Sequence, residues 1–278
     1  MTRPQAPPVR TQRWVDGEWR QAGDLLAAEE PLQLSLDGEP LSIVMRTPGN
    51  DLELALGLLW SEGVITALDQ VARVRISAEA GETEPGLALE PDLVESNQVD
   101  VHLTVRPGRR PQRSFFSSSA CGVCGATTLE SLALDFPPVA PGPAVDAALL
   151  PELVERLRAQ QRVFEQTGGL HAAGLFSADG TLEVLREDVG RHNAVDKVVG
   201  RALLDGRLPA SESVLAVSGR AGYEVVQKAV AAGIPVLAAV GAPSSLAVAT
   251  ARRFDLTLAG FLKKDRFNVY SAPERLQR

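Results

Sequence analysis

The last hundred residues alternate short apolar runs with helical segments, and this pattern restricts the fold more than any other feature. Apolar runs over 214–217, 234–240 and 256–261 are separated by amphipathic segments over 222–232 and 243–253. Strands joined by helices of about ten residues form βαβ units, whose strands lie parallel. Continuous apolar runs fit strands that are covered on both faces. The pattern predicts an α/β fold with a largely parallel sheet for this half of the chain.

The first hundred residues predict a smaller α+β unit. Asp-Gly pairs indicate tight hairpins over 14–19 and 32–45, because aspartate and glycine accept the positive φ of a type I′ turn. A helix that ends at Gly63 and strands near 71–77 and 98–105 follow. A polar tail is expected before these elements, over 1–13. After them we expect a helix at 151–165, a hairpin over 170–187 and a helix over 192–205. The predicted organisation is a mobile tail and hairpin at 1–30, a small α+β domain at 31–106, a loop and Pro-rich linker at 107–150, and an α/β cofactor-binding domain at 151–278.

Composition excludes several classes of protein. The chain has 35 acidic against 28 basic residues, a formal net charge of −7. A general nucleic-acid binder needs a basic field to neutralise phosphates, so no nucleic-acid partner is expected. No apolar stretch approaches the roughly 20 residues of a membrane span, and the N-terminus lacks the apolar core of a secretory signal. These features predict a cytoplasmic protein without a membrane partner.

The chain contains two cysteines, Cys121 and Cys124, in a C-x-x-C arrangement. Two cysteines cannot build a disulfide framework or a four-cysteine zinc site. The zinc deaminases pair a C-x-x-C with an H-x-E motif, and no histidine of this chain begins an H-x-E sequence. We therefore expect no metal site, and the pair is interpreted as reactive thiols.

The surroundings of the cysteines favour the thiolate form. A helix expected over 126–134 begins just after Cys124, and its N-terminal dipole stabilises negative charge. The preceding segment adds positive charge from Arg109, Arg110 and Arg113. A thiol–disulfide redox pair and a sulfur-handling thiol both remain open at this point.

Small and polar residues follow each of the three apolar runs. Segments 218–220 and 241–245 combine glycine, serine and an expected helix start, which suits a phosphate, and 263–266 adds positive charge. In an open α/β sheet, ligands bind beyond the carboxyl ends of the strands. The pattern indicates an anionic ligand with phosphates, such as a nucleotide, although ordinary βα turns have the same composition. No dinucleotide-binding or P-loop motif is present.

Charged and polar residues are concentrated over 186–197, at an expected boundary between strand and helix. His192 could act there as an acid or base oriented by Asp188 or Glu187. A buried salt-bridge network with a helix cap explains the same residues, and this interpretation is favoured over catalysis, while a role in ligand binding or subunit contact stays open. His171 is interpreted as a core histidine.

Five motifs, taken together and in order, resemble the formate dehydrogenase accessory sulfurtransferase (FdhD) family. Further similarity lies in the Arg46–Gly49 segment, the helix over 53–63 and the segment 260–270. The motifs are SACGVCG at 119–125, TGGLH at 167–171, REDVGRHNAVDK at 186–197, SGR at 218–220 and APSSLA at 242–247.

The resemblance implies a cytoplasmic sulfurtransferase and sulfur carrier. It implies that a cysteine desulfurase donates the sulfur, which passes to the bis-molybdopterin guanine dinucleotide molybdenum cofactor for formate dehydrogenase. By position in the motif, Cys121 would carry the persulfide and Cys124 would be its neighbour in the relay. The resemblance also implies a homodimer and a cytidine deaminase-like layering of the larger domain. The residues expected to bind the cofactor are Ser218, Gly219, Arg220, Phe261, Leu262, Lys263, Lys264, Asp265 and Arg266.

One departure from the family lies at Lys263 and Lys264, where an arginine-centred segment is expected. Lysine keeps the charge but loses the bidentate geometry of arginine toward phosphate. Two other functions remain open: a cofactor-binding chaperone that transfers no sulfur, and a thiol–disulfide redox protein.

Overall fold

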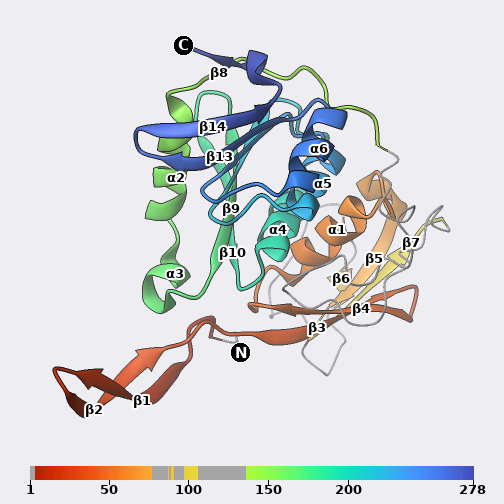
Figure 1. Ribbon diagram of the computed structural model, residues 1–278. Helices are drawn as coiled ribbons and strands as arrows, with labels where there is room; N and C mark the ends of the chain where they lie inside the picture. The colour runs from red at the N-terminus through yellow and green to blue at the C-terminus, as the bar shows by residue number, and fades with distance from the viewer. Residues whose placement is uncertain (1–3, 77–86, 88, 91–96, 106–135) are drawn as a thin grey trace.

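The structure is a computed structural model that describes residues 4–76, 87, 89–90, 97–105 and 136–278 (Figure 1). Its helices are α1 (Asp51–Ser61), α2 (Leu149–Ala159), α3 (Arg162–Thr167), α4 (Arg191–Leu204), α5 (Tyr223–Ala231) and α6 (Ser245–Arg253), with 3-10 turns at Leu68–Gln70 and Pro273–Arg275. Its strands are β1 (Pro8–Val15), β2 (Glu18–Leu25), β3 (Glu30–Leu36), β4 (Glu39–Arg46), β5 (Val71–Ile76), β6 (Leu89–Glu90), β7 (Gln98–Leu103), β8 (Val145–Asp146), β9 (His171–Ser177), β10 (Leu182–Asp188), β11 (Ser213–Val217), β12 (Val236–Ala239), β13 (Thr257–Lys263), β14 (Arg266–Ser271) and β15 (Leu276–Gln277).

The larger sheet has six strands in the order β10-β9-β11-β12-β13-β14. The pairs β11–β12 and β12–β13 are parallel, as the βαβ pattern predicts, and the other three pairings are antiparallel. The α/β class is confirmed, but the prediction of a largely parallel sheet is wrong. The β9–β10 and β13–β14 hairpins each add an antiparallel edge to the parallel centre.

Both faces of this sheet are covered by helices (Figure 1). Leu215 and Val217 of β11 face the core that includes α4, α5 and α6, whereas Val214 and Ala216 face the core that includes α2. Alternate residues of one strand are therefore apolar on both sides. This arrangement explains why the strand reads as a continuous apolar run.

A second sheet of five strands has the order β4-β3-β7-β5-β6, and α1 lies between this sheet and α4 (Figure 1). Every residue of α1 from Leu52 to Ser61 is buried, as expected for a helix that is covered all round. Gly57 of α1 and Gly200 of α4 allow the two helices to touch. A Cβ added at Gly57 would lie 1.8 Å from the backbone oxygen of Asp196. One apolar core therefore joins the five-stranded sheet, α1 and a face of the six-stranded sheet.

The β1–β2 hairpin extends away from the rest of the molecule (Figure 1). Asp16 and Gly17 at its turn have positive φ values of 52° and 87°, which confirms the Asp-Gly turn predicted over 14–19. The prediction of a polar tail through residue 13 is wrong from Pro8 onward, because this segment pairs with β2. Trp14 and Trp19 pack edge to face across the hairpin with their ring centroids 5.1 Å apart.

The single helix predicted over 151–165 is two helices, α2 and α3, that separate at Gln160 and Gln161. The cause is the Glu187 carboxylate at the end of β10, which accepts hydrogen bonds from the backbone N–H groups of Val163 (3.0 Å) and Phe164 (2.8 Å). A carboxylate at this position satisfies the free N–H groups of a helix start and favours the helix dipole. The break turns the Gln161 side chain into the interior.

Candidate functional site

The predicted phosphate-type turns meet at one edge of the six-stranded sheet, where β11, β12 and β13 end. The Gly241 N–H donates to the Gly219 carbonyl (3.0 Å), and the Phe261 N–H donates to the Gly241 carbonyl (3.1 Å). The three loops are therefore hydrogen-bonded side by side. The structure thus brings segments 218–220 and 261–266 together, as expected of a ligand-binding edge.

The loops approach closely at two glycines, Gly219 and Gly241, and the closer approach is at Gly241. A Cβ added at Gly241 would lie 3.0 Å from Cα of Arg220 and 3.0 Å from the Gly219 carbonyl oxygen. A Cβ at Gly219 would lie 3.4 Å from Nδ1 of His171. A bulkier residue at Gly241 would separate the ends of β11 and β12.

Positive potential gathers at this edge. Helices α5 and α6 begin there, and the Ser244 hydroxyl accepts a hydrogen bond from the Ala247 N–H (3.2 Å) as the cap of α6. The partial positive charges of helix N-termini and exposed basic side chains attract anions. Exposed basic side chains near these ends are Arg220, Lys263, Lys264 and Arg266.

The segment expected to bind the cofactor, 261–266, is the end of β13 and the turn into β14. Phe261 is 45% exposed and adopts a left-handed φ of 55°, and Lys263, Lys264, Asp265 and Arg266 are exposed. Phe261, Lys263 and Arg266 line a depression of about 340 Å³. Leu262 differs from its neighbours, because its side chain is 3% exposed and packs in the core beneath α2. Leu262 therefore positions the segment from below and presents no side chain at the surface.

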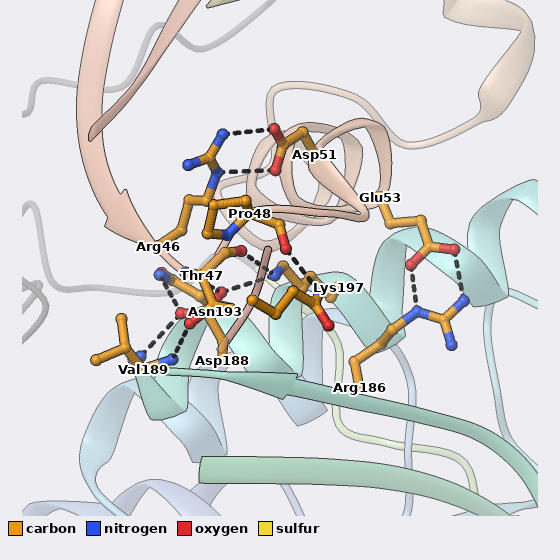
Figure 2. A network of polar contacts seen from close by, with 12 residues as sticks. Arg46, Thr47, Pro48, Asp51, Glu53, Arg186, Asp188, Val189, Asn193 and Lys197 are labelled. Carbon is orange, nitrogen blue, oxygen red and sulfur yellow. Dashed lines mark hydrogen bonds and ion pairs between the residues drawn. The ribbon is translucent and has the colours of Figure 1, made fainter. Parts of the chain in front are cut away.

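The polar segment 186–197 forms a buried network with the loop that follows β4 (Figure 2). The Lys197 ammonium and the Asp188 carboxylate lie 2.7 Å apart, and both side chains are fully buried. Asp188 also accepts hydrogen bonds from the Thr47 N–H (3.2 Å) and the Asn193 amide (2.9 Å), while Lys197 donates to the Thr47 carbonyl (2.9 Å). This geometry agrees with the structural interpretation of the segment, a salt-bridge network rather than a catalytic centre.

Two further ion pairs extend this network along α1 (Figure 2). Arg46 pairs with Asp51 through Nε (2.9 Å) and Nη2 (2.7 Å), and Arg186 of β10 pairs with Glu53 through Nη2 (2.6 Å) and Nε. Bidentate arginine–carboxylate pairs fix orientation as well as distance. The Arg46 pair therefore holds the start of α1 against β4, and the Arg186 pair holds it against β10, the strand that ends at Asp188.

His192 has a different carboxylate partner from the one predicted. Its Nδ1 lies 3.3 Å from Oε2 of Glu224 on α5, and both side chains are buried. Asp188 is engaged with Lys197, and Glu187 caps α3, so the prediction that either orients His192 is wrong. Glu224 lies 32 positions further along the chain, and sequence spacing offers no signal for this pair.

A cavity of about 530 Å³ opens beside the same sheet edge, between α2, α3 and the start of β9. Its walls include Leu157, Gln161, Phe164, Leu170, His171 and Ser218. His171 is half-buried in this wall, so its interpretation as a core histidine is wrong. The predicted helix through residue 165 gave no reason to place Gln161 or Phe164 in a site. The helix break at Gln160 and Gln161, stabilised by the Glu187 carboxylate, is what brings them together.

The pKa of His171 is lowered below its ordinary value of 6.5. Burial disfavours the charged imidazolium, the nearby Arg191 and Arg220 charges repel it, and the Asp188 carboxylate opposes these effects in part. His171 is therefore neutral at pH 7, and the wall of the cavity at this point carries no charge.

Acidification is expected to weaken the folded state through His171. The pKa of His171 is lower in the folded than in the unfolded chain, so the folded state binds this proton less readily. The free energy of unfolding therefore has its full value with respect to His171 above pH 6.5. The contribution of His171 declines as the pH falls below that value and is fully lost below the folded pKa. Urea unfolding at about pH 7.5 and about pH 5 measures the loss, since the ordinary histidine pKa lies between them. A His171→Gln variant should lose less stability over this interval; an equal loss would contradict the prediction.

The predicted sulfur-handling residues, Cys121 and Cys124, and the arginines at 109, 110 and 113 lie outside the described residues. Among the residues that are described, no cluster of histidine, cysteine and carboxylate side chains could hold a metal ion. In the same part of the chain, no helix is long and apolar enough to cross a membrane.

The sequence was compared with protein-family models and with known proteins. The FdhD/NarQ family model matches residues 27–277. Several relatives carry the name sulfur carrier protein FdhD, and two of them show the extent of the similarity. The protein of Streptomyces avermitilis is 49% identical over 271 residues, with 94% of this chain and 92% of its own length covered. That of Mycolicibacterium paratuberculosis is 48% identical over 259 residues, with 91% and 92% covered.

A solved structure from Desulfotalea psychrophila, described as a formate dehydrogenase accessory protein, has a similar fold. Its TM-score is 0.75 at 26% identity, over 99% of this chain and 100% of that one. The family model and the relatives confirm the resemblance to this family over most of the chain. The chain belongs to the FdhD/NarQ family.

Proposed function

We propose that this protein is a sulfurtransferase that carries sulfur as a cysteine persulfide and delivers it to a molybdenum cofactor destined for formate dehydrogenase. The observation that carries the proposal is the identity of 48–49% to proteins named sulfur carrier protein FdhD, over at least 91% of the chain. The description of the solved relative as a formate dehydrogenase accessory protein supports the same client. We further propose, on the family resemblance, a cytoplasmic homodimer whose larger sheet is layered as in cytidine deaminase.

In the first step, a cysteine desulfurase is the sulfur donor. The Cys121 thiolate attacks the outer sulfur of the donor persulfide, and the donor cysteine leaves as a thiolate. One sulfur–sulfur bond forms and one breaks, so the exchange needs no oxidant or reductant. Cys124, three positions away, is the neighbouring thiol in the relay to the cofactor.

The cargo is the bis-molybdopterin guanine dinucleotide form of the cofactor, and the sheet edge suits its phosphates. Arg220, Lys263, Lys264 and Arg266 supply exposed positive charge, and the N-terminus of α5, which follows Gly222, adds the partial positive charge of the helix dipole. Phe261 offers an exposed apolar ring beside them, and Asp265 limits the net charge of the turn. Ser218 anchors the loop, because its hydroxyl accepts a hydrogen bond from the Ala172 N–H (2.8 Å).

Replacement of Cys121 with alanine is expected to abolish sulfur loading. Wild type incubated with a cysteine desulfurase and cysteine should gain one sulfur atom by intact mass, and the added sulfur should disappear on reduction. Cys121→Ala should gain none, because the accepting thiolate is absent. Cys124→Ala is the matched control and should still be loaded.

Other outcomes would favour the competing functions. Equal loading of Cys121→Ala and wild type would contradict the assignment of Cys121. Restoration of formate dehydrogenase activity by both alanine variants, in cells that lack the native protein, would favour a cofactor chaperone without sulfur transfer. A reversible Cys121–Cys124 disulfide that turns over without any sulfur adduct would favour a redox protein.

A further inference from the structure

The β1–β2 hairpin is well paired but has no core of its own. Every residue from Pro8 to Leu25 is exposed or half-buried. β2 lies beside α3, whereas β1 has its main contacts with β2 alone (Figure 1). An isolated two-stranded hairpin is only marginally stable in water, and a third strand or a packed partner stabilises it. The hairpin also lies outside residues 27–277, which the family model matches. These features indicate a surface for a partner.

The outer edge of β1 has unused backbone hydrogen-bond donors. The Leu26 N–H donates to the Pro7 carbonyl (3.1 Å), which fixes where hydrogen-bonded pairs alternate along the hairpin. In this alternation, the N–H groups of Arg10, Gln12 and Trp14 point away from β2. In the described part of the chain, no third strand pairs with β1 and these three N–H groups donate no hydrogen bond. β1 thus offers a strand edge to which an extended segment can add.

The two faces of the hairpin differ in chemistry. Trp14 and Trp19 lie opposite each other on one face and are 57% and 66% exposed. Arg13 and Arg20 lie opposite each other on the other face, and like charges in this position destabilise a strand pair. Arg20 has an exposed ion pair with Glu18 (3.4 Å), whereas Arg13 has no ion pair with any described residue. Beside the aromatic pair, the opposite face therefore carries positive charge that a partner can neutralise.

We propose that β1 binds an extended segment of another protein, in which apolar and acidic side chains alternate. Side chains of an added strand alternate between the two faces, so apolar ones lie beside Trp14 and acidic ones beside Arg13. Antiparallel pairing with β1 of a second copy would bring like faces together and add further arginines beside Arg13. An anionic membrane would repel Asp16 and Glu18, which lie at the tip beside the tryptophans. This contact is separate from the cysteines and the cargo site of the proposed function.

Tryptophan fluorescence of the full chain, titrated with synthetic peptides, tests the proposal, because Trp14 and Trp19 are exposed at the binding edge. The probe is a capped peptide of about ten residues, the upper range of strand length, in which valine and glutamate alternate. Wild type should bind it about tenfold more tightly than the same peptide with lysine in place of glutamate, through several cross-strand charge pairs. Arg13→Glu should remove this preference, and the hairpin is expected to stay folded because an opposite-charge pair with Arg20 replaces two like charges. Arg278→Glu, at an exposed arginine near the other end of the chain, is the matched control and should keep the preference.

Two proline variants test whether the peptide adds to β1 as a strand. Gln12 and Gln21 lie opposite each other, and the N–H groups of both point outward, so proline at either position removes no hydrogen bond between the strands. Gln12→Pro should abolish binding of the glutamate peptide, whereas Gln21→Pro, the matched control on β2, should bind it as wild type does.

Several results would overturn the proposal. They are equal affinity of wild type for the two peptides, no binding of either peptide, an unchanged preference in Arg13→Glu, and equal binding by the two proline variants. A change of oligomeric state in Gln12→Pro, measured by sedimentation, would place a second copy of the chain on β1 instead. Saturable binding of wild type to phosphatidylglycerol vesicles, lost in Arg13→Glu, would place a membrane there, and either result also overturns the proposal.

Discussion

Alanine at Gly57 or at Gly200 is expected to destabilise the protein by about 3 kcal/mol or more, the upper range for overpacked cores. At Gly200, the added Cβ would lie 1.9 Å from the backbone oxygen of Glu53, and at Gly57 the corresponding distance to Asp196 is 1.8 Å. The obstacle in each case is backbone, so no side-chain rotation relieves it. Helices α1 and α4 would have to move apart and open the shared core. Urea unfolding of each variant measures the loss.

Gly23→Ala is the matched control for this prediction. Gly23 lies in β2, and a Cβ there would meet no atom within 4 Å. Its stability should stay within about 0.5 kcal/mol of wild type, as for most exposed positions. Unfolding of Gly57→Ala at the same urea concentration as Gly23→Ala would show that the helices do not cross as closely as the structure indicates.

Removal of the Asp188 carboxylate is the second change with a large expected effect. Asp188→Ala leaves the Lys197 ammonium fully buried without its partner, which costs about 3–5 kcal/mol in buried pairs of this kind. The variant also removes the acceptor for the Thr47 N–H, so the loop after β4 loses its attachment. Chemical denaturation gives the change in unfolding free energy.

A double variant separates the buried charge from the other contacts. Asp188→Ala combined with Lys197→Met should be more stable than Asp188→Ala alone, because no buried charge is left unpaired. The exposed pair of Glu152 and Arg156, 3.1 Å apart, is the control, and Glu152→Ala should cost less than about 1 kcal/mol. A loss of unfolding free energy below about 1 kcal/mol for Asp188→Ala would contradict the prediction.

Turns and central strands could be predicted from the sequence, because the residues within each of them determine its conformation. The Asp16–Gly17 and Asp37–Gly38 turns have the positive φ values that their residues favour, and β11 reads as apolar because both of its faces are covered. The β14 strand was not predicted, because RFNVYS mixes exposed and half-buried positions at the edge of the sheet. Edge strands lack the continuous apolar run that marks a central strand.

Parts of the candidate site depend on residues far apart in the chain, and these could not be predicted. The Glu187 carboxylate of β10 accepts a hydrogen bond from the Val163 N–H and so starts α3 as a separate helix. Glu224 of α5 lies beside His192 of α4. The burial of Gln161 follows from the first of these contacts. The edge formed by Ser218, Gly241 and Phe261 was predictable, because βαβ topology places the ends of successive parallel strands together.

The burial of α1 on all sides has a consequence for synthesis on the ribosome. Its main partner α4 begins at Arg191, so α1 and the five-stranded sheet leave the ribosome long before the surface that covers them. Contacts between residues far apart in the sequence slow folding. Until α4 is synthesised, the apolar surface of α1 that it covers stays exposed and is prone to aggregation. We expect chains truncated before Leu204 to be insoluble, and the nascent protein to depend on chaperones until α4 has emerged.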